Sequence, residues 1–288
     1  MNASIAPGEV VGIIGFGNMG RGIARACVSK GFHVLVSEID PVMGRKNLDL
    51  MKSELQARVK KGKMTESDFE RTMSFITLID DMQGYSKASV VIEAITENQD
   101  MKAALYKELE RRVSPEVPIA TNTSSLSVSE LSRNLMNRRR FGGMHFFNPA
   151  DVMRLVEVVR GEETSDETLS FLSSFATQLG KTPLQVPDIA GFYVNRILFP
   201  LLIEGIRVLE QKGTSAKDID EALKLGGNLP MGPLELCDFI GNDVVLSICE
   251  SLLSRTSDPR FTPPSLLRDI VKQGKLGRKT GAGFHSYR

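Results

Sequence analysis

The residue types best suited to catalysis lie between residues 142 and 160, in the stretch GGMHFFNPADVMRLVEVVR. His145 ends an apolar run and is followed by Phe-Phe-Asn-Pro. Because Pro149 cannot donate to a sheet ladder and biases Asn148 toward an extended or turn conformation, the chain should turn just past His145. Glu157 lies within LVEVV, a β-branched run typical of a buried strand, where a carboxylate is costly without a partner. Two adjacent strands joined by a short turn would place Glu157 beside His145.

Such a histidine–carboxylate pair can act as a general base. The carboxylate would orient one imidazole nitrogen, and the other nitrogen would accept a proton from a substrate. The alternative for these residues taken alone is structural: His145 is a hydrogen-bonded core histidine, and Glu157 pairs with Arg154 or Arg160. The rest of the chain favours the catalytic interpretation.

A glycine-rich turn follows the first predicted strand, EVVGIIG, and leads into a helical segment of small and apolar residues. The next predicted strand ends in Glu38, at roughly the 20-residue distance typical of dinucleotide sites. In such sites one glycine permits the tight turn, one lets the backbone approach the pyrophosphate, and one lets the helix pack on the strand. The predicted cofactor-binding residues of this turn are Gly15, Gly17, Asn18, Met19 and Gly20.

Glu38 bears on which dinucleotide is bound. A carboxylate there accepts hydrogen bonds from the ribose hydroxyls and repels a 2′-phosphate. No arginine follows it immediately, so we expect NAD rather than NADP. The alternative is that Glu38 is an exposed charge at a strand end.

The composition is that of an ordinary globular protein: 288 residues, 41% hydrophobic and 25% charged, with a net charge of +1. This charge balance argues against nucleic acid as a partner. Cys27, Cys237 and Cys249 fit neither a metal site nor a disulfide framework, which favours a reducing compartment. We see no secretory signal, and the apolar runs are too short to span a bilayer. We therefore expect a cytoplasmic protein without a metal or a membrane partner.

The chain is long enough for two domains, and its pattern changes near residue 187. Before that point strands alternate with helical segments, which predicts a doubly wound, Rossmann-type α/β domain over residues 1–187. After it only helical patterns follow, which predicts an all-α domain over residues 188–288. The helices expected there span residues 191–211, 216–225, 233–239 and 243–253.

Two polar stretches in the first domain have two interpretations each. Residues 40–69 form one charged helical stretch that includes Lys60-Lys61-Gly62-Lys63, either a solvated helix end or a phosphate-binding patch for a bulky substrate. The polar run at residues 121–125 follows a predicted strand. Its side chains face a ligand crevice, cap the next helix, or do both.

Two further stretches are interpreted as surface turns. Residues 138–140, Arg-Arg-Arg, lack the interleaved aromatics of a nucleic-acid patch and are expected to be an exposed turn. The C-terminal stretch GKLGRKTGAGFHSYR has no strand before it and no helix after it, so a glycine-rich surface turn is favoured over a phosphate loop.

Several motifs together resemble those of the 3-hydroxyacyl-CoA dehydrogenases, most closely the short bacterial 3-hydroxybutyryl-CoA dehydrogenase type. They cover nearly the whole chain in order, and HFFNP followed by LVEV is the most specific part. The matching motifs are GFGNMGRGIA (15–24), EAITEN (93–98), TNTSSL (121–126), GGMHFFNP (142–149), VMRLVEVV (152–159), GFYVNR (191–196), PMGPLEL (230–236) and KTGAGF (279–284).

The resemblance implies NAD-dependent, reversible oxidation of a 3-hydroxyacyl-CoA, such as 3-hydroxybutyryl-CoA, to the 3-oxoacyl-CoA. It also implies a homodimer whose helical domain closes over the substrate. His145 resembles the catalytic base and Glu157 its orienting carboxylate. Ser124 resembles a residue that contacts both the substrate hydroxyl and the cofactor, and Asn195 a helical-domain residue that completes the site.

Further roles come from the same resemblance. Glu38, Glu97, Lys102 and Asn148 are similar to cofactor contacts in the family. Lys61 is similar to a lysine that holds the CoA phosphates, which raises the phosphate-binding interpretation of that patch to equal standing.

Two positions depart from the family pattern. Ala190 stands where proline is frequent, and Glu54 stands where some members have a serine near CoA. A new carboxylate would repel CoA phosphates, so the same reaction on a substrate bound to an acyl carrier protein remains an alternative. An alternative of another class is a non-catalytic NAD-binding redox sensor, which would need the glycines and Glu38 but neither His145 nor Glu157.

Overall fold

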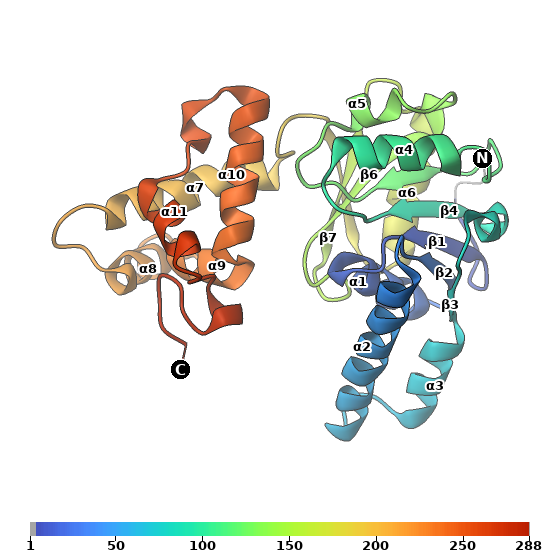
Figure 1. Ribbon diagram of the computed structural model, residues 1–288, viewed down its shortest axis with the longest axis horizontal. Helices are drawn as coiled ribbons and strands as arrows, with labels where there is room; N and C mark the ends of the chain where they lie inside the picture. Colours follow the sequence, from blue (N-terminus) through green and yellow to red (C-terminus); the bar gives the residue numbers. More distant parts are fainter. Residues whose placement is uncertain (1–3, 288) are drawn as a thin grey trace. The chain divides into compact units, whose positions relative to one another are not determined.

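The apolar runs of the N-terminal part pair into one eight-stranded sheet, ordered β3-β2-β1-β4-β5-β6-β7-β8 (Figure 1). The structure, a computed structural model, describes residues 4–287. Within this part of the chain, all neighbouring strands run parallel except β6 and β7. The strands are β1 Val10–Ile14, β2 His33–Ser37, β3 Ile76–Leu78, β4 Val90–Glu93, β5 Ile119–Thr121, β6 Phe141–Phe146, β7 Leu155–Arg160 and β8 Thr182–Pro187.

Helices cover both faces of this sheet, as a largely parallel sheet with buried, near-continuous apolar strands requires. Apolar side chains of α1, α2 and α6 join one core cluster with the strands, and α4 lies across the other face (Figure 1). The fold is therefore the predicted doubly wound arrangement. The helices of this unit are α1 Asn18–Val28, α2 Pro41–Lys60, α3 Glu66–Ser74, α4 Gln99–Leu109, α5 Val128–Ser132 and α6 Asp166–Gln178.

The helical stretch expected over residues 40–69 consists of two helices, and the lysine run lies where the first one ends. The first, α2, ends at Lys60, and Gly62 then adopts a left-handed backbone with φ of 66°. Thr65 starts α3 as its N-cap by accepting a hydrogen bond from the Asp68 N–H. The two helices pack together beside the edge strand β3 (Figure 1).

The antiparallel pair β6 and β7 is the feature that matters most for the site. In its register Gly143 lies opposite Val159, and His145 lies opposite Glu157. The end of β6 that carries His145 is thus beside the carboxyl ends of β1, β4 and β5, where ligands bind in open α/β sheets.

The chain divides into two units between Asp188 and Ile189, one residue beyond the boundary expected from the sequence. The second unit is helical, as predicted, with its own core around α7, α9 and α10. Among the described residues no helix is both long and apolar enough to cross a membrane. The α-helices of the second unit are α7 Val194–Leu209, α8 Ala216–Leu225, α9 Pro233–Ile240, α10 Asn242–Thr256 and α11 Ser265–Lys272. The sequence did not predict α11.

Arg140 does not lie in an exposed turn as expected. Residues 138–140 form the short 3-10 helix η2 (Arg138–Arg140), but the side chain of Arg140 is buried. Its guanidinium donates to the Ser114 carbonyl and lies 3.6 Å from the Glu110 carboxylate. A charge can be buried there because these partners replace water.

The C-terminal glycine-rich segment lies at the surface, as expected, and is anchored on Asp238 of α9. The buried Asp238 carboxylate accepts hydrogen bonds from the N–H groups of Phe284 (2.9 Å) and His285 (2.8 Å). It also accepts from Asn242 Nδ2 at 2.8 Å and the Tyr287 hydroxyl at 3.1 Å. Burial, and then the nearby Asp238 carboxylate, raise the pKa of Tyr287 to about 12, so this hydroxyl stays a donor at neutral pH.

We expect Asp238→Ala to lower the free energy of unfolding by on the order of 3 kcal/mol, because several buried donors lose their shared acceptor. Urea denaturation measures this. Glu221→Ala on α8 is the matched control, since Glu221 forms an exposed ion pair with Lys224 and should change stability little. Equal effects of the two variants would contradict the anchoring role of Asp238.

Candidate active site

The centre of the candidate site is a contact between His145 and Glu157. His145 Nδ1 lies 2.8 Å from Glu157 Oε2, and both side chains are buried, with exposed fractions of 7% and 0%. The antiparallel register of β6 and β7 places the two residues directly opposite each other. The structure thus brings together the predicted pair, whereas Arg160 donates instead to Asp166. The imidazole ring also packs on Phe147, with 4.5 Å between ring centroids.

Two asparagine side chains form hydrogen bonds with the segment that follows this histidine. Asn122, just after β5, accepts a hydrogen bond from the Phe146 N–H at 2.9 Å. Asn148 precedes a cis peptide bond to Pro149, and its side chain accepts from Asn18 Nδ2 at 3.1 Å. The predicted cofactor residues Asn18 and Asn148 therefore lie together, at the start of α1.

The loop that carries Ser124 is organised by the carboxylate of Glu97. Glu97 Oε1 accepts from the N–H groups of Ser124 (2.5 Å) and Ser125 (3.1 Å) and from the Ser124 hydroxyl (3.1 Å). The Thr123 hydroxyl donates to the same oxygen at 2.8 Å. The two predicted site residues Glu97 and Ser124 are thus in direct contact, and Glu97 sets the local backbone.

The predicted cofactor contact Lys102 lies inside the protein, with an exposed fraction of 1%. Its ammonium lies 2.5 Å from Glu93 Oε1 and 3.5 Å from Glu97 Oε2. Lys102 therefore links a fully buried carboxylate at the end of β4 to the carboxylate that holds the Ser124 loop. A direct contact of Lys102 with a cofactor stays a prediction.

The glycine turn after β1 fits a dinucleotide pyrophosphate. A Cβ at Gly20 would lie 1.9 Å from the Gly15 carbonyl oxygen, so only glycine lets α1 pack this closely. A Cβ at Gly17 would meet no atom within 4 Å, which leaves open space over the loop. Gly17 is also the N-cap of α1 and has no side chain to occupy its first N–H groups, which favour anions. Met19, in the first turn, packs against the core.

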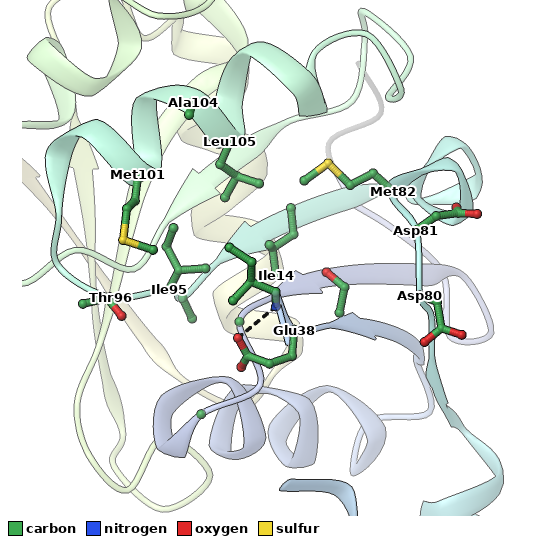
Figure 2. Close-up of a pocket in the computed structure, with 15 residues that line it drawn as sticks. Ile14, Glu38, Asp80, Asp81, Met82, Ile95, Thr96, Met101, Ala104 and Leu105 are labelled. Atoms are coloured by element: carbon green, nitrogen blue, oxygen red, sulfur yellow. Dashed lines mark hydrogen bonds between the residues drawn. The ribbon is translucent and has the colours of Figure 1, made fainter. Parts of the chain in front are cut away.

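A cavity of about 500 Å³ opens beside this turn, and Figure 2 shows side chains that line it. Met101 and Leu105 of α4 lie on one side, and Glu38 lies at the end of β2. Glu38 Oε2 accepts from the Phe16 N–H at 2.9 Å, which fixes the carboxylate next to the glycine turn. Asp80 and Asp81 add two more carboxylates to the lining. The size, the apolar walls and the acidic rim fit an adenosine group without a 2′-phosphate.

The negative charge of Glu54, which was expected to repel CoA phosphates, is compensated by arginines. Glu54 Oε2 accepts from Arg25 Nη1 at 2.9 Å, and Arg21 lies 3.6 Å from the other oxygen. Arg25 and Arg58 also hold Asp151, which follows the Asn-Pro turn. Burial alone would raise the pKa of Asp151, but these two guanidiniums hold it below its ordinary value. Glu54 is thus part of an ion-pair network rather than an isolated negative charge.

Lys61 and Asn195 are the remaining predicted site residues. Lys61 is exposed in the turn after α2, and Asn195 is buried in the first turn of α7, in the second unit. Their roles stay predictions. Within residues 4–287 there is no group of three or more His, Cys, Asp or Glu residues arranged to hold a metal ion.

Sequence reasoning missed three residues that shape the site: Glu93, Asn122 and Thr123. Glu93 lies in an apolar strand, SVVIEA, so the argument that drew attention to Glu157 applied to it as well. Asn122 and Thr123 were seen only as part of a polar run, because their partners come from distant parts of the chain.

Comparisons with known proteins agree with this geometry over the whole chain. Residues 10–189 match the family model for the 3-hydroxyacyl-CoA dehydrogenase NAD binding domain, and residues 191–287 match the model for the C-terminal domain. The chain belongs to the 3-hydroxyacyl-CoA dehydrogenase family. Membership confirms the predicted fold class, the NAD cofactor and the assignment as an oxidoreductase.

Individual relatives are similar over nearly their full lengths. A probable 3-hydroxybutyryl-CoA dehydrogenase of Bacillus subtilis is 41% identical, over 96% of each chain. A 3-hydroxybutyryl-CoA dehydrogenase of Bradyrhizobium diazoefficiens is 37% identical, over 96% of this chain and 95% of the relative. The crystal structure of (S)-3-hydroxybutyryl-CoA dehydrogenase from Ralstonia eutropha superposes with a TM-score of 0.90 at 42% identity, covering 97% of this chain and 99% of that one.

We expect this family member to use NADH far better than NADPH, and Glu38→Ser to narrow the preference at least tenfold, about 1.4 kcal/mol. The reason is the repulsion between Glu38 and a 2′-phosphate; Asp80 and Asp81 would keep part of the preference. The measurement is kcat/KM with each dinucleotide. Glu162→Gln is the control, because Glu162 follows β7 at the opposite edge of the sheet. Equal kcat/KM values of the wild type for NADH and NADPH would show that Glu38 does not determine the choice of dinucleotide.

Proposed function

We propose that this protein oxidises a 3-hydroxyacyl-CoA, specifically 3-hydroxybutyryl-CoA, to the 3-oxoacyl-CoA with NAD, reversibly, and that His145 is its general base. The observation that carries the proposal is the 2.8 Å contact between His145 Nδ1 and Glu157 Oε2 at the ligand-binding edge of the sheet. The names of the relatives support the substrate class.

The proton step follows from the orientation of the imidazole. With Glu157 accepting from Nδ1–H, the proton-accepting nitrogen is Nε2. Nε2 takes the proton of the substrate 3-hydroxyl, and an imidazolium forms. Glu157, fully buried, stabilises that cation at the moment it appears and does not need to take the proton itself.

When bound, NAD supplies the acceptor for the hydrogen that leaves C3 with its electron pair as the C3–O bond becomes a carbonyl. The residues that would hold it are those of the glycine turn, Glu38, Glu97, Lys102 and Asn148. The chain contributes a fixed position for the reacting carbon relative to His145.

Ser124 is the residue we assign to orient the substrate hydroxyl and the developing carbonyl. Its backbone and hydroxyl are both held by Glu97, so its direction is set before substrate binds. Because its single proton is donated to Glu97, the Ser124 oxygen can accept a hydrogen bond from the substrate 3-hydroxyl and hold that hydroxyl in place.

We infer that the acyl group of the substrate is carried by CoA. The exposed lysines 60, 61 and 63 lie at the end of α2 and in the turn that follows it, where they can meet nucleotide phosphates as point charges. The carboxylate of Glu54, the one feature that favoured a carrier protein, is neutralised by Arg25 and Arg21.

We further infer a cytoplasmic homodimer. The three cysteines are free and buried, as in proteins of reducing compartments. On α7, Ile197 and Leu201 are one turn apart on the same side of the helix and are 74% and 37% exposed, which supports a second copy of the chain as their cover.

His145→Gln should lower kcat roughly 10²- to 10⁴-fold with little change in NADH binding, since only the proton acceptor is lost. Glu157→Gln should also lower kcat, because the imidazolium loses its compensating charge. The assay follows NADH oxidation with acetoacetyl-CoA, and binding is followed by NADH fluorescence. The control is His33→Gln, which alters an exposed histidine at the other end of the sheet that stacks on Phe75. A His145→Gln enzyme with normal turnover would rule out the mechanism.

Lys61→Ala should raise the KM for acetoacetyl-CoA with kcat nearly unchanged, as expected for the loss of binding that is equal in ground and transition states. The wild type should prefer acetoacetyl-CoA over the same acyl group on an acyl carrier protein. Steady-state kinetics with both thioesters test this, with Lys107→Ala, an exposed lysine on α4, as the control. Preference for the carrier-protein thioester, or an unchanged KM for CoA, would overturn the assignment of the carrier.

A further inference from the structure

Glu93 is a carboxylate buried without any solvent exposure at the end of β4. Its two oxygens have different partners. Oε1 faces Lys102 Nζ at 2.5 Å and the Ile95 N–H at 2.7 Å. Oε2 accepts from the Tyr106 hydroxyl at 2.5 Å and the Thr121 hydroxyl at 2.8 Å. Four donors thus replace water around one buried charge.

The two sides of Glu93 lead to different parts of the protein. On the Oε2 side, Tyr106 and Thr121 join α4 and β5 to β4, and the Tyr106 ring packs edge-on against Phe141 of β6. Burial raises the pKa of Tyr106 well above its ordinary value, and the neighbouring Glu93 charge raises it further, so this hydroxyl remains a donor. This side has the character of a structural support.

The Oε1 side leads to the candidate active site. Lys102 bridges Glu93 and Glu97 with an ammonium that is itself buried. Glu97 is 33% exposed, so without the ammonium behind it its side chain could turn toward solvent. Its other oxygen holds the N–H groups of Ser124 and Ser125. Because a buried ion pair is seldom the most stable filling for a core, a role in fixing one geometry accounts for it better than stability does.

We propose that Glu93 is a positioning residue for the reaction: it anchors Lys102, which holds Glu97 against the amides of Ser124 and Ser125 and so fixes the direction of the Ser124 hydroxyl. The inference rests on the proposed role of Ser124 in orienting the substrate. Glu93 itself touches neither Ser124 nor Ser125; it acts through two intervening side chains.

The test compares Glu93→Gln with Tyr106→Phe in the full-length protein. Both change the interactions around the same buried side chain, but only the first removes the negative charge that holds Lys102. Hydrogen exchange of the backbone amides of residues 122–126 reports the loop directly and does not depend on activity. We expect exchange there to rise about tenfold or more in Glu93→Gln and to stay near the wild-type rate in Tyr106→Phe.

Kinetics give the second readout. Glu93→Gln should lower kcat/KM for acetoacetyl-CoA by roughly 10- to 100-fold, as expected for a misplaced catalytic group, and Tyr106→Phe should stay within about twofold. In Glu97→Gln the link between Lys102 and the Ser124 loop is already broken, so adding Glu93→Gln should lower kcat/KM little further. If Glu93→Gln does not fold, Glu93→Gln/Lys102→Met removes both charges together and should show the same rise in exchange.

The outcomes separate this inference from the proposed function. Unchanged exchange over residues 122–126 in Glu93→Gln, or the same rise in Tyr106→Phe, would overturn the positioning role. Additive losses of kcat/KM in the double variant with Glu97→Gln would overturn it as well. Raised exchange with unchanged turnover would uphold Glu93 as the residue that fixes the loop and would refute the role of Ser124 in the reaction.

Discussion

The antiparallel pairing of β6 with β7 is the constraint on which the candidate site depends. Side chains alternate between the two faces of a strand, so a slip of one residue would turn Glu157 away from His145. A parallel neighbour would need a long crossover, and the short connection through Pro149 would not suffice. The one antiparallel pair in the otherwise parallel sheet of the described residues thus brings a carboxylate from the next strand beside the histidine.

Buried carboxylates recur at this edge of the sheet, and the two that matter differ in what they hold. Glu157 meets a histidine whose charge changes during the proposed reaction, so it can respond to the chemistry. Glu93 meets a lysine and two hydroxyls that stay as they are, so it can only hold a geometry. Desolvation makes each of them costly without a partner, and the nature of the partner then decides the function.

Local patterns in the sequence predicted most of the fold and part of the site. The glycine turn and Glu38 are close in sequence, and a short turn joins the strands of His145 and Glu157. The misses involve partners that are distant in sequence: Arg140 is buried because the Ser114 carbonyl and the Glu110 carboxylate contact its guanidinium. Asp238 holds the C-terminal segment in a way that no glycine pattern indicates. Glu93 could have been predicted from the sequence, since a carboxylate in an apolar strand needs a partner when it is buried.

In the proposed function, the chemistry and the choice of acyl carrier depend on physically different parts of the first unit. His145 and Glu157 are buried, and their interaction is little affected by salt or by the identity of the distant carrier. The lysines of the turn after α2 are exposed, so their attraction for phosphates is screened and adjustable. The carboxylate of Glu54, on α2, is paired with Arg21 and Arg25, so its negative charge is compensated. The charge of one side chain therefore does not decide which ligand such a surface binds. The surface potential depends on that charge together with the charges paired with it.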